Sequence, residues 1–122
     1  MPPTSPLTGD GRVLPLSPQV FHVLLALHQG PLHGYSIIQD IRQRTGEEIR
    51  LTASTLYDAL ARLVDAGLIE EVAAPAADVQ DSRRRYYRIT RAGRQAAQLE
   101  AQRLDRLLRS ARATGVSPRS SR

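Results

Sequence analysis

Three breaks that contain glycine divide residues 17–67 into three helical segments. Gly30-Pro31 follows the first segment, Gly46 follows the second and Gly67 follows the third. Glycine readily adopts the left-handed backbone that closes a helix, and proline cannot continue one. Helices shorter than about 12–15 residues are marginal in water on their own. The three segments must therefore pack against one another, which predicts a small, mostly α-helical head.

The first two segments have recognisable starts. Ser17 is a typical N-cap and Pro18 suits the first helical position, so the first helix is predicted from Pro18 to about Gln29. It is apolar on nearly all sides, which is typical of a central helix or of a subunit interface. The second helix is predicted to start near residues 33–34, where His33 is assigned either to helix-start chemistry or to packing, and to end at residues 45–46.

The third segment has two distinct faces. It starts at Thr52, a good N-cap, and stops at Gly67. Its apolar residues recur at spacings of three and four and therefore share one face, which is formed by Leu56, Ala59, Leu60 and Leu63. The opposite face is predicted to consist of short or acidic residues: Ser54, Asp58, Ala61 and Asp65.

Two short strands, residues 68–72 and 83–90, are joined by a loop of small residues and predict a β-hairpin. The second strand begins with three consecutive arginines. Because side chains alternate along a strand, Tyr87 and Ile89 share one face, whereas Tyr86 falls on the other. This pattern assigns Tyr87 to the core.

The remaining segments complete the predicted organisation. Thr90 is expected to cap a last helix over residues 91–112. The arm that precedes the first helix is rich in proline, and its Leu14 and Leu16 are expected to dock on the core. The predicted parts are a flexible arm (1–16), a head (17–90), a C-terminal helix (91–112) and a disordered tail (113–122).

The composition narrows the class of protein. A chain of 122 residues suits one domain, and with no cysteine or tryptophan and one phenylalanine its core must be aliphatic. All seventeen basic residues are arginine, the formal net charge is +5 and the pI is about 10.7, which favours a polyanionic partner. No apolar run approaches the ~18 residues of a membrane span, and no signal peptide is visible, so a cytoplasmic protein without membrane contact is expected.

The order of elements is that of a winged helix-turn-helix. Three short helices precede a hairpin and one further helix, so the predicted fold is mostly α with a small β-hairpin. In this fold the third helix enters the major groove of DNA, where short hydrogen-bonding side chains let its positive N-terminal end approach the phosphates. The hairpin forms the wing, whose arginines suit the phosphate backbone and the narrow minor groove. Double-stranded DNA is therefore the expected partner.

Several motifs together resemble the PadR family of bacterial transcriptional regulators. The resemblance covers about residues 16–110. It is carried by residues 30–35 (GPLHGY), 51–57 (LTASTLY), 60–63 (LARL), 67–69 (GLI) and 84–93 (RRYYRITRAG). It implies a homodimeric repressor that binds an inverted-repeat operator, with dimer contacts from the C-terminal helix. The single modest C-terminal helix is similar to that of short-form members.

The fold argument and the resemblance together define a candidate DNA-binding set. Tyr35 matches a family tyrosine near the DNA-facing side of the second helix, and residues 54–57 match the start of the recognition helix. The complete set is Tyr35, Thr52, Ser54, Thr55, Tyr57, Arg62, Arg83, Arg84, Arg85 and Arg88. Asp58 departs from the family pattern, because many relatives carry a neutral or basic residue there. Its carboxylate either pairs with Arg62 one turn on or accepts from a cytosine amino group.

A second candidate set concerns assembly and control. Leucines alternate with arginines on the last helix, and the first helix is apolar on nearly all sides. Together these two helices predict a homodimer. The predicted interface residues are Phe21, Leu25, Leu99, Leu104, Leu107 and Leu108. The sequence leaves two modes of control open. Either a small-molecule effector binds at Phe21 and the C-terminal helix, or control lies in the expression level alone. With a single phenylalanine, we predict no tight pocket for a planar drug.

Other functions fit the sequence less well. The acidic Asp58 and Asp65 would suit a winged-helix module that binds protein rather than DNA. A MarR-like winged helix is a further alternative, but the motifs quoted above argue against it. An enzyme is not indicated, because the chain has no glycine-rich phosphate loop and no nucleophile elbow. Its histidines, His22, His28 and His33, are not spaced as metal ligands. We therefore expect no cofactor and no metal.

Overall fold

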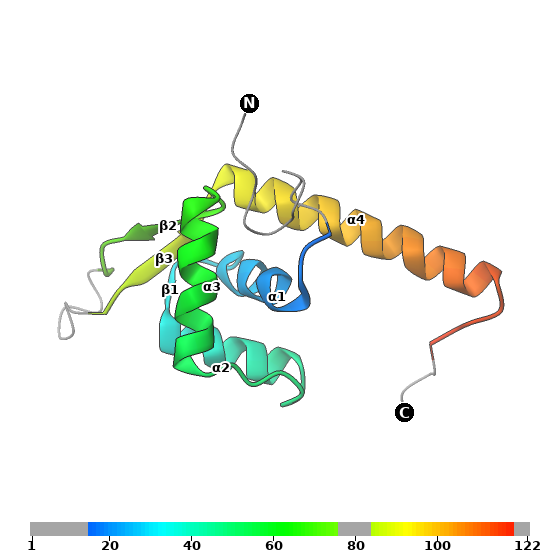
Figure 1. Ribbon diagram of the computed structural model, residues 1–122, viewed down its shortest axis with the longest axis horizontal. Coiled ribbons are helices and arrows are strands. Elements are labelled where there is room, and N and C mark those ends of the chain that lie inside the picture. Colours follow the sequence, from blue (N-terminus) through cyan, green and yellow to red (C-terminus); the bar gives the residue numbers. More distant parts are fainter. Residues whose placement is uncertain (1–14, 76–83, 119–122) are drawn as a thin grey trace.

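The computed structural model describes residues 15–75 and 84–118, and every structural statement below refers to these residues. Four helices and three short strands follow one another along the chain (Figure 1): α1 (Pro18–Leu27), β1 (Leu32–His33), α2 (Gly34–Arg44), α3 (Ala53–Asp65), β2 (Ile69–Val72), β3 (Tyr86–Ile89) and α4 (Arg91–Ala113). The helix limits agree with the sequence predictions to within two residues. No helix in the described part is long and apolar enough to cross a membrane.

The predicted helix caps are confirmed. Ser17, Thr52 and Thr90 each accept a hydrogen bond from the backbone N–H three residues later, at 3.2, 3.1 and 3.1 Å. The Thr90 hydroxyl also donates to the Gly67 carbonyl at 2.7 Å. A single side chain therefore both starts α4 and ties it to the turn that ends α3.

The sheet has one more strand than the sequence predicted. Its order is β1-β3-β2, and both pairings are antiparallel, with Leu32 opposite Tyr87 and Glu70 opposite Arg88. The predicted hairpin corresponds to β2 and β3, but β3 starts at Tyr86 rather than at Arg83, which lies outside the described residues. The sequence did not predict β1 because a strand of two residues carries no alternating pattern.

The extra strand also explains an unexpected burial. Tyr87 and Ile89 are buried as predicted, but Tyr86 is only 7% exposed, although it falls on the same face as the exposed Arg88. The ring of His33, on the neighbouring β1, meets Tyr86 edge to face at a centroid distance of 5.3 Å. A strand that local patterning could not reveal therefore covers this tyrosine.

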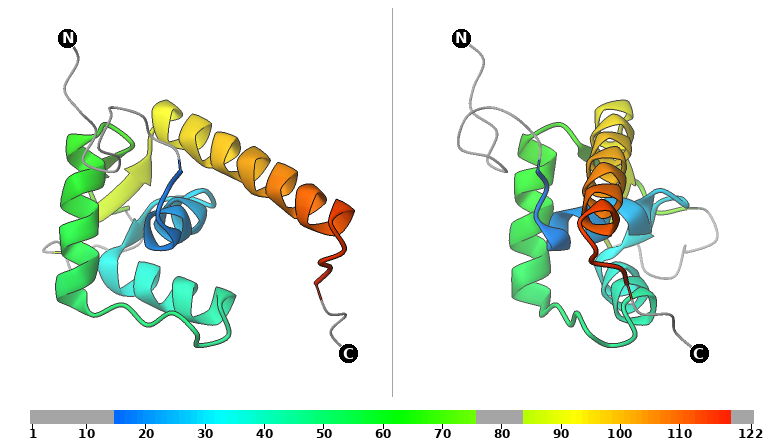
Figure 2. Two further views of the ribbon diagram at one scale, coloured as in Figure 1. Left: turned by 45° about the vertical axis from the view of Figure 1, so that its right-hand side comes forward. Right: turned by 90° about the vertical axis from the view of Figure 1, so that its right-hand side faces the viewer.

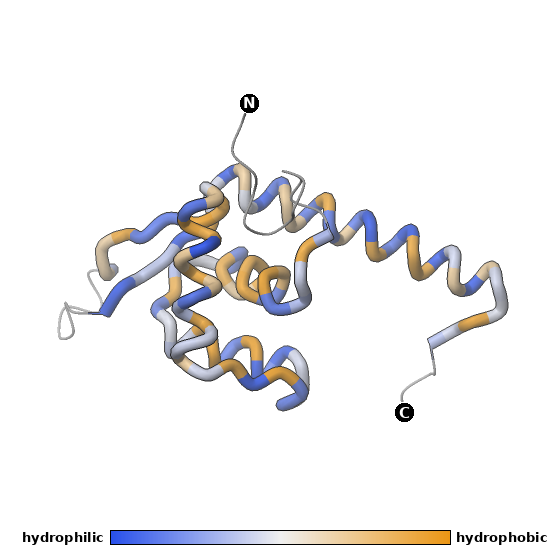
Figure 3. The backbone as a smooth tube through the Cα atoms, viewed as in Figure 1, coloured by the Kyte–Doolittle hydropathy of each residue, from blue (hydrophilic) through white to orange (hydrophobic). Residues whose placement is uncertain are grey.

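The core is aliphatic and is centred on α1. Val23 and Leu24 are completely buried, and α1 lies between α4 and the other two helices (Figure 2). The hydropathy colouring shows α1 as the most continuously apolar helix (Figure 3). Leu16 docks on this core at 5% exposure, as predicted, whereas Leu14 lies outside the described residues.

Helix α4 belongs to the head over only part of its length. Its buried residues are Gly93, Ala96, Ala97 and Glu100, all within its first ten positions. Beyond Glu100 the helix projects away from the other elements (Figures 1 and 2). The projecting part therefore has no tertiary support from the described chain.

Candidate nucleic-acid interface

The exposed face of α3 is built mostly from short side chains. Its inner face is the completely or almost completely buried trio Leu56, Leu60 and Leu63, which fixes the orientation of the helix. Its exposed residues over the first two and a half turns are Ala53, Ser54, Thr55, Tyr57, Asp58, Ala61 and Arg62. Short neighbours let a helix approach the floor of a DNA groove closely. The predicted residues of this helix therefore share one accessible surface.

Thr52 and Thr55 form the first turn of this surface. The Thr52 hydroxyl accepts the backbone N–H of Thr55 at 3.1 Å and donates to its Oγ1 at 2.9 Å. Ser54 lies exposed between them. The N–H groups of such a first turn carry the positive end of the helix dipole, which attracts phosphate.

Tyr57 lies in space left open by a glycine, Gly34. The buried Gly34 starts α2, and a Cβ atom at this position would lie 2.6 Å from the Tyr57 hydroxyl oxygen and 3.0 Å from Cζ. The ring therefore lies directly over the first turn of α2, while 46% of Tyr57 stays exposed. Gly34 is needed for this close approach. The family motif contains Gly34 within residues 30–35, but it does not indicate the contact with Tyr57.

His33 joins three elements of the site. Its Nδ1 accepts the Ser36 N–H at 3.3 Å and so caps α2, as predicted, which leaves the ring proton on Nε2 to donate to Ser36 Oγ at 2.9 Å. The Arg84 Nη1 atom lies 3.3 Å from His33 Nε2. The Tyr35 ring lies parallel to the imidazole at 6.5 Å, and Tyr86 meets its edge. The start of α2 and the base of the wing are therefore packed together.

The predicted wing arginines have different environments. Arg84 and Arg85 are exposed at the start of β3. Arg88 forms an exposed ion pair with Glu70, its cross-strand neighbour. Burial and the nearby Glu71 raise the pKa of the Tyr87 phenol, whereas a hydrogen bond with Arg85 opposes the shift. Arg84 and Arg85 are therefore the described wing cations best placed to meet an external anion.

Asp58 is exposed at the middle of the outward face of α3. The sequence left two partners open for this carboxylate, Arg62 or a cytosine amino group. Within the described ranges, no ion pair or hydrogen bond joins it to Arg62. Both charged groups are thus presented to solvent on the same helix face.

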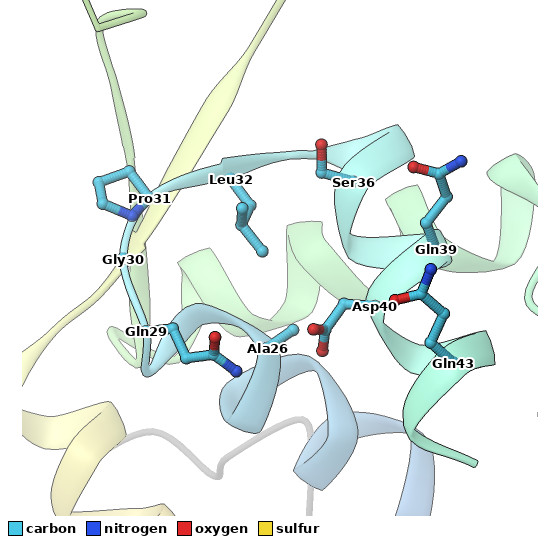
Figure 4. Close-up of a pocket in the computed structure, with 9 residues that line it drawn as sticks. All are labelled: Ala26, Gln29, Gly30, Pro31, Leu32, Ser36, Gln39, Asp40 and Gln43. Atoms are coloured by element: carbon cyan, nitrogen blue, oxygen red, sulfur yellow. The ribbon is translucent and has the colours of Figure 1, made fainter. Parts of the chain in front are cut away.

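Recesses of the described chain also lie outside this face. One, of about 410 Å³, is polar and lies between the end of α1 and α2, where Gln29, Gln43 and Asp40 line it (Figure 4). Asp40 is already paired with Arg44 at 2.9 Å. Another, of about 540 Å³, is a more apolar groove between α1 and α4, lined by Phe21, Leu25, His28, Arg94, Ala97 and Ala101. Phe21 and Leu25 of the predicted interface therefore face α4 across an open groove.

A recognition-type helix packed beside a small antiparallel sheet defines a winged helix, a class of fold that includes many DNA-binding proteins. The chain matches the transcriptional regulator PadR-like family over residues 23–99. It belongs to this family of transcriptional regulators, as the sequence motifs predicted.

Solved structures share this fold, and one curated protein is similar in sequence. A PadR family transcription regulator from Clostridium difficile R20291 has a TM-score of 0.70 at 22% identity, covering 80% of this chain and 98% of that one. Bacillus subtilis PadR in complex with operator DNA has a TM-score of 0.53 at 23% identity, covering 65% and 44%. An uncharacterized 37.1 kDa protein in transposon Tn4556 of Streptomyces fradiae is 40% identical over 100 residues, 82% of this chain. The chain spans about a quarter (24%) of that relative.

Proposed function

We propose that this chain is a sequence-specific DNA-binding repressor that acts as a homodimer on an inverted-repeat operator. The observation that carries the proposal is the exposed N-terminal half of α3, with its short polar residues, beside exposed Arg84 and Arg85 at the base of the wing. A helix in the major groove and a basic wing on the backbone form the contact pattern of winged-helix proteins. The structure of Bacillus subtilis PadR, which shares this fold, was solved in complex with operator DNA and supports DNA as the partner.

In this mode each part of the face has a separate task. Ser54 and Thr55 bring hydroxyl groups and backbone N–H groups to a phosphate or base edge at the start of α3. Tyr35, in the first turn of α2, and Tyr57, on the flank of α3 that faces α2, contact the sugar–phosphate backbone through exposed rings. Arg62 lies one turn further along and binds a phosphate. Contacts to phosphate position the protein, whereas contacts to base edges specify the sequence.

The first test is fluorescence anisotropy with the intergenic DNA upstream of the gene, against a shuffled duplex. Both titrations are run at near-physiological and at doubled salt concentration. We expect a preference of ~10³ or more for the native sequence. Equal binding to both duplexes, lost at the higher salt concentration, would mean that only nonspecific electrostatic contact occurs on these sequences. No binding to either would favour a protein-interaction module, for which the acidic Asp58 and Asp65 are the supporting residues.

Replacing Arg84 and Arg85 together with alanine should weaken DNA binding by about ten-fold to a hundred-fold near physiological salt. Each phosphate contact releases counterions from the DNA when the protein binds. Loss of two such contacts should therefore make the slope of log K against log salt shallower by up to about 1.8. The measurement is the same anisotropy titration at several salt concentrations. The double variant Arg106→Ala and Arg109→Ala loses the same charge on α4 and should keep the wild-type slope. Equal slopes for wild type and the wing variant would contradict the wing contact.

The homodimer is supported by an apolar stripe on the projecting part of α4. On an ideal helix, at about 100° per residue, Leu104, Leu107 and Leu108 continue the line of Ala97 and Glu100, which pack on the head. These leucines are 38%, 57% and 36% exposed in the single chain. An exposed leucine stripe on a charged helix favours a partner helix. Leu99, also in the predicted interface, does not belong to this stripe, because it lies about 130° around the helix from its centre.

Replacing Leu107 with glutamate should weaken the dimer by about a hundred-fold or more. The symmetric interface contains the residue twice, and each copy loses roughly 1.5–3 kcal/mol of burial. Sedimentation equilibrium over a range of concentrations gives the dissociation constant. Gln102→Glu adds the same charge on the opposite side of α4 and should leave it unchanged. Identical dissociation constants for wild type and Leu107→Glu would exclude this interface.

We further propose that any small effector binds in the groove between α1 and α4. Phe21 and Leu25 give the groove an apolar wall, and Arg94 and His28 lie at its polar side. A ligand there would change how α4 sits on the head and hence the spacing of two recognition helices in a dimer. The groove holds a single aromatic ring from phenylalanine, which supports a small ligand rather than a large planar drug.

A further inference from the structure

We propose that Asp58 determines operator specificity by accepting a hydrogen bond from the exocyclic amino group of a cytosine in the major groove. The proposal rests on the proposed function, in which α3 enters that groove. Neither the family resemblance nor the structural likenesses assign a role to this residue.

The position of Asp58 is central on the exposed face. It lies in the second turn of α3, directly opposite the buried Leu56 and Leu60. Two of its neighbours one turn away along the helix, Ser54 and Ala61, are short and exposed, whereas the longer Arg62 lies to one side. Neither Ser54 nor Ala61 is long enough to cover the Asp58 carboxylate, which lies open at the centre of this face.

The charge of Asp58 decides what it can contact. A carboxylate accepts hydrogen bonds and repels phosphate, so a site among phosphates is unfavourable unless a donor meets it. Within the described part of the chain, no arginine occupies this carboxylate, and the exposed Arg62 one turn on is available for a phosphate. The donor must therefore come from the DNA.

The base edges in the major groove leave one good donor. Guanine presents two acceptors there and thymine presents one, and both repel a carboxylate. Adenine presents its amino group beside the N7 acceptor, so a carboxylate that approaches the amino group also meets a repulsive lone pair. Cytosine presents its amino group with no acceptor on the same base. The chemistry of this position therefore favours a C·G pair in each half-site.

The experiment is selection of binding sites from a random double-stranded DNA library with the full chain, followed by sequencing. Three proteins are compared: wild type, Asp58→Asn and the matched control Asp65→Asn. Asp65 is exposed on the same face two turns further along, beyond the groove-facing half of α3, so its replacement removes the same charge. Since both residues are exposed, circular dichroism should give wild-type folds for both variants.

We expect wild type and Asp65→Asn to enrich one inverted repeat with the same cytosine in each half-site. Asp58→Asn should enrich that repeat with adenine in place of the cytosine, because an amide pairs with the amino group and N7 of adenine together. Competition titrations with the two duplexes should show a reversal of about ten-fold in preference.

Three other outcomes would overturn the proposal, and they separate it from the proposed function. If Asp58→Asn enriches the unchanged repeat, Asp58 does not read a base, although the protein still binds an operator. If Asp58→Asn binds every duplex more tightly by one common factor, the carboxylate only repels phosphate. If wild type enriches no sequence, the proposed function fails and this inference fails with it.

Discussion

Replacing Gly93 with alanine is expected to lower the free energy of unfolding by about 3 kcal/mol, although alanine is the better helix former. Gly93 lies in the first turn of α4. A Cβ atom there would lie 2.0 Å from the backbone oxygen of Leu68 and 2.8 Å from Cγ1 of Ile89. The Leu68 carbonyl is itself held by the Thr90 N–H at 3.0 Å, so it cannot move away without loss of that bond. The substitution must therefore shift α4 relative to the sheet.

Urea unfolding of wild type and Gly93→Ala, monitored by circular dichroism at pH 7, tests this expectation. Gln95→Ala is the matched control, because it places alanine at an exposed position two residues further along α4 and should change stability by less than about 0.5 kcal/mol. A Gly93→Ala protein as stable as the control would mean that α4 has more space beside Leu68 than the structure allows.

The second large effect is expected at Glu100, a buried charge that connects two distant segments. Its Oε1 accepts the backbone N–H of Leu16 at 3.2 Å and the Nε–H of Arg103 at 2.9 Å. Its Oε2 accepts from Arg103 Nη2 at 2.7 Å. Only 2% of Glu100 is exposed. The carboxylate therefore fixes the segment before α1 to the middle of α4.

Replacing Glu100 with alanine should cost about 3 kcal/mol of stability, because the Leu16 N–H is left buried without an acceptor and a packed side chain is lost. Glu100→Gln keeps the shape and should cost about 1–2 kcal/mol, because an amide oxygen is a weaker acceptor for Arg103 than a carboxylate. Asp105→Asn breaks the exposed ion pair with Arg109 and should change stability by less than about 0.5 kcal/mol. Urea unfolding at pH 7 measures all three, and equal stabilities for Glu100→Ala and Asp105→Asn would contradict the buried role.

The same carboxylate predicts how stability depends on pH. The hydrogen bond from Arg103 holds the pKa of Glu100 below its ordinary value of 4.5, helped by the Leu16 N–H and opposed by burial. The unfolded chain therefore binds the proton at a higher pH than the folded chain. The stabilisation is fully present above the ordinary pKa and is lost as the pH falls through the folded value. Wild type should lose more stability between pH 7 and pH 3 than Glu100→Gln does, and parallel curves would exclude this linkage.

The parts of the fold that depend on neighbouring residues could be predicted from the sequence. The caps Ser17, Thr52 and Thr90 act on backbone N–H groups three residues away, and Gly46 and Gly67 have the positive φ values of 60° and 76° that end a helix. Helical spacing likewise predicted the buried and exposed faces of α3. Such signals depend on bond geometry over one or two turns, so local residue types are enough to identify them.

The candidate site was predicted in composition but not in arrangement. The resemblance and the helix order selected the α3 residues, Tyr35 and the wing arginines. They did not indicate that Gly34 makes room for the Tyr57 ring or that Glu70 pairs with Arg88 across the sheet. The first depends on how α2 crosses α3 and the second on strand register, and a single sequence carries no direct signal for either.

The tertiary structure decided the contacts between segments that are far apart in the chain. Leu16 and Glu100 are 84 residues apart, and nothing near either residue indicates their hydrogen bond. The two-residue strand β1 exists because β3 lies beside it, and Tyr86 is buried because that pairing brings His33 over its ring. Local chemistry thus settles which segments form helices and where they end. Packing settles which polar and aromatic side chains are buried, because burial depends on neighbours that only the folded chain brings together.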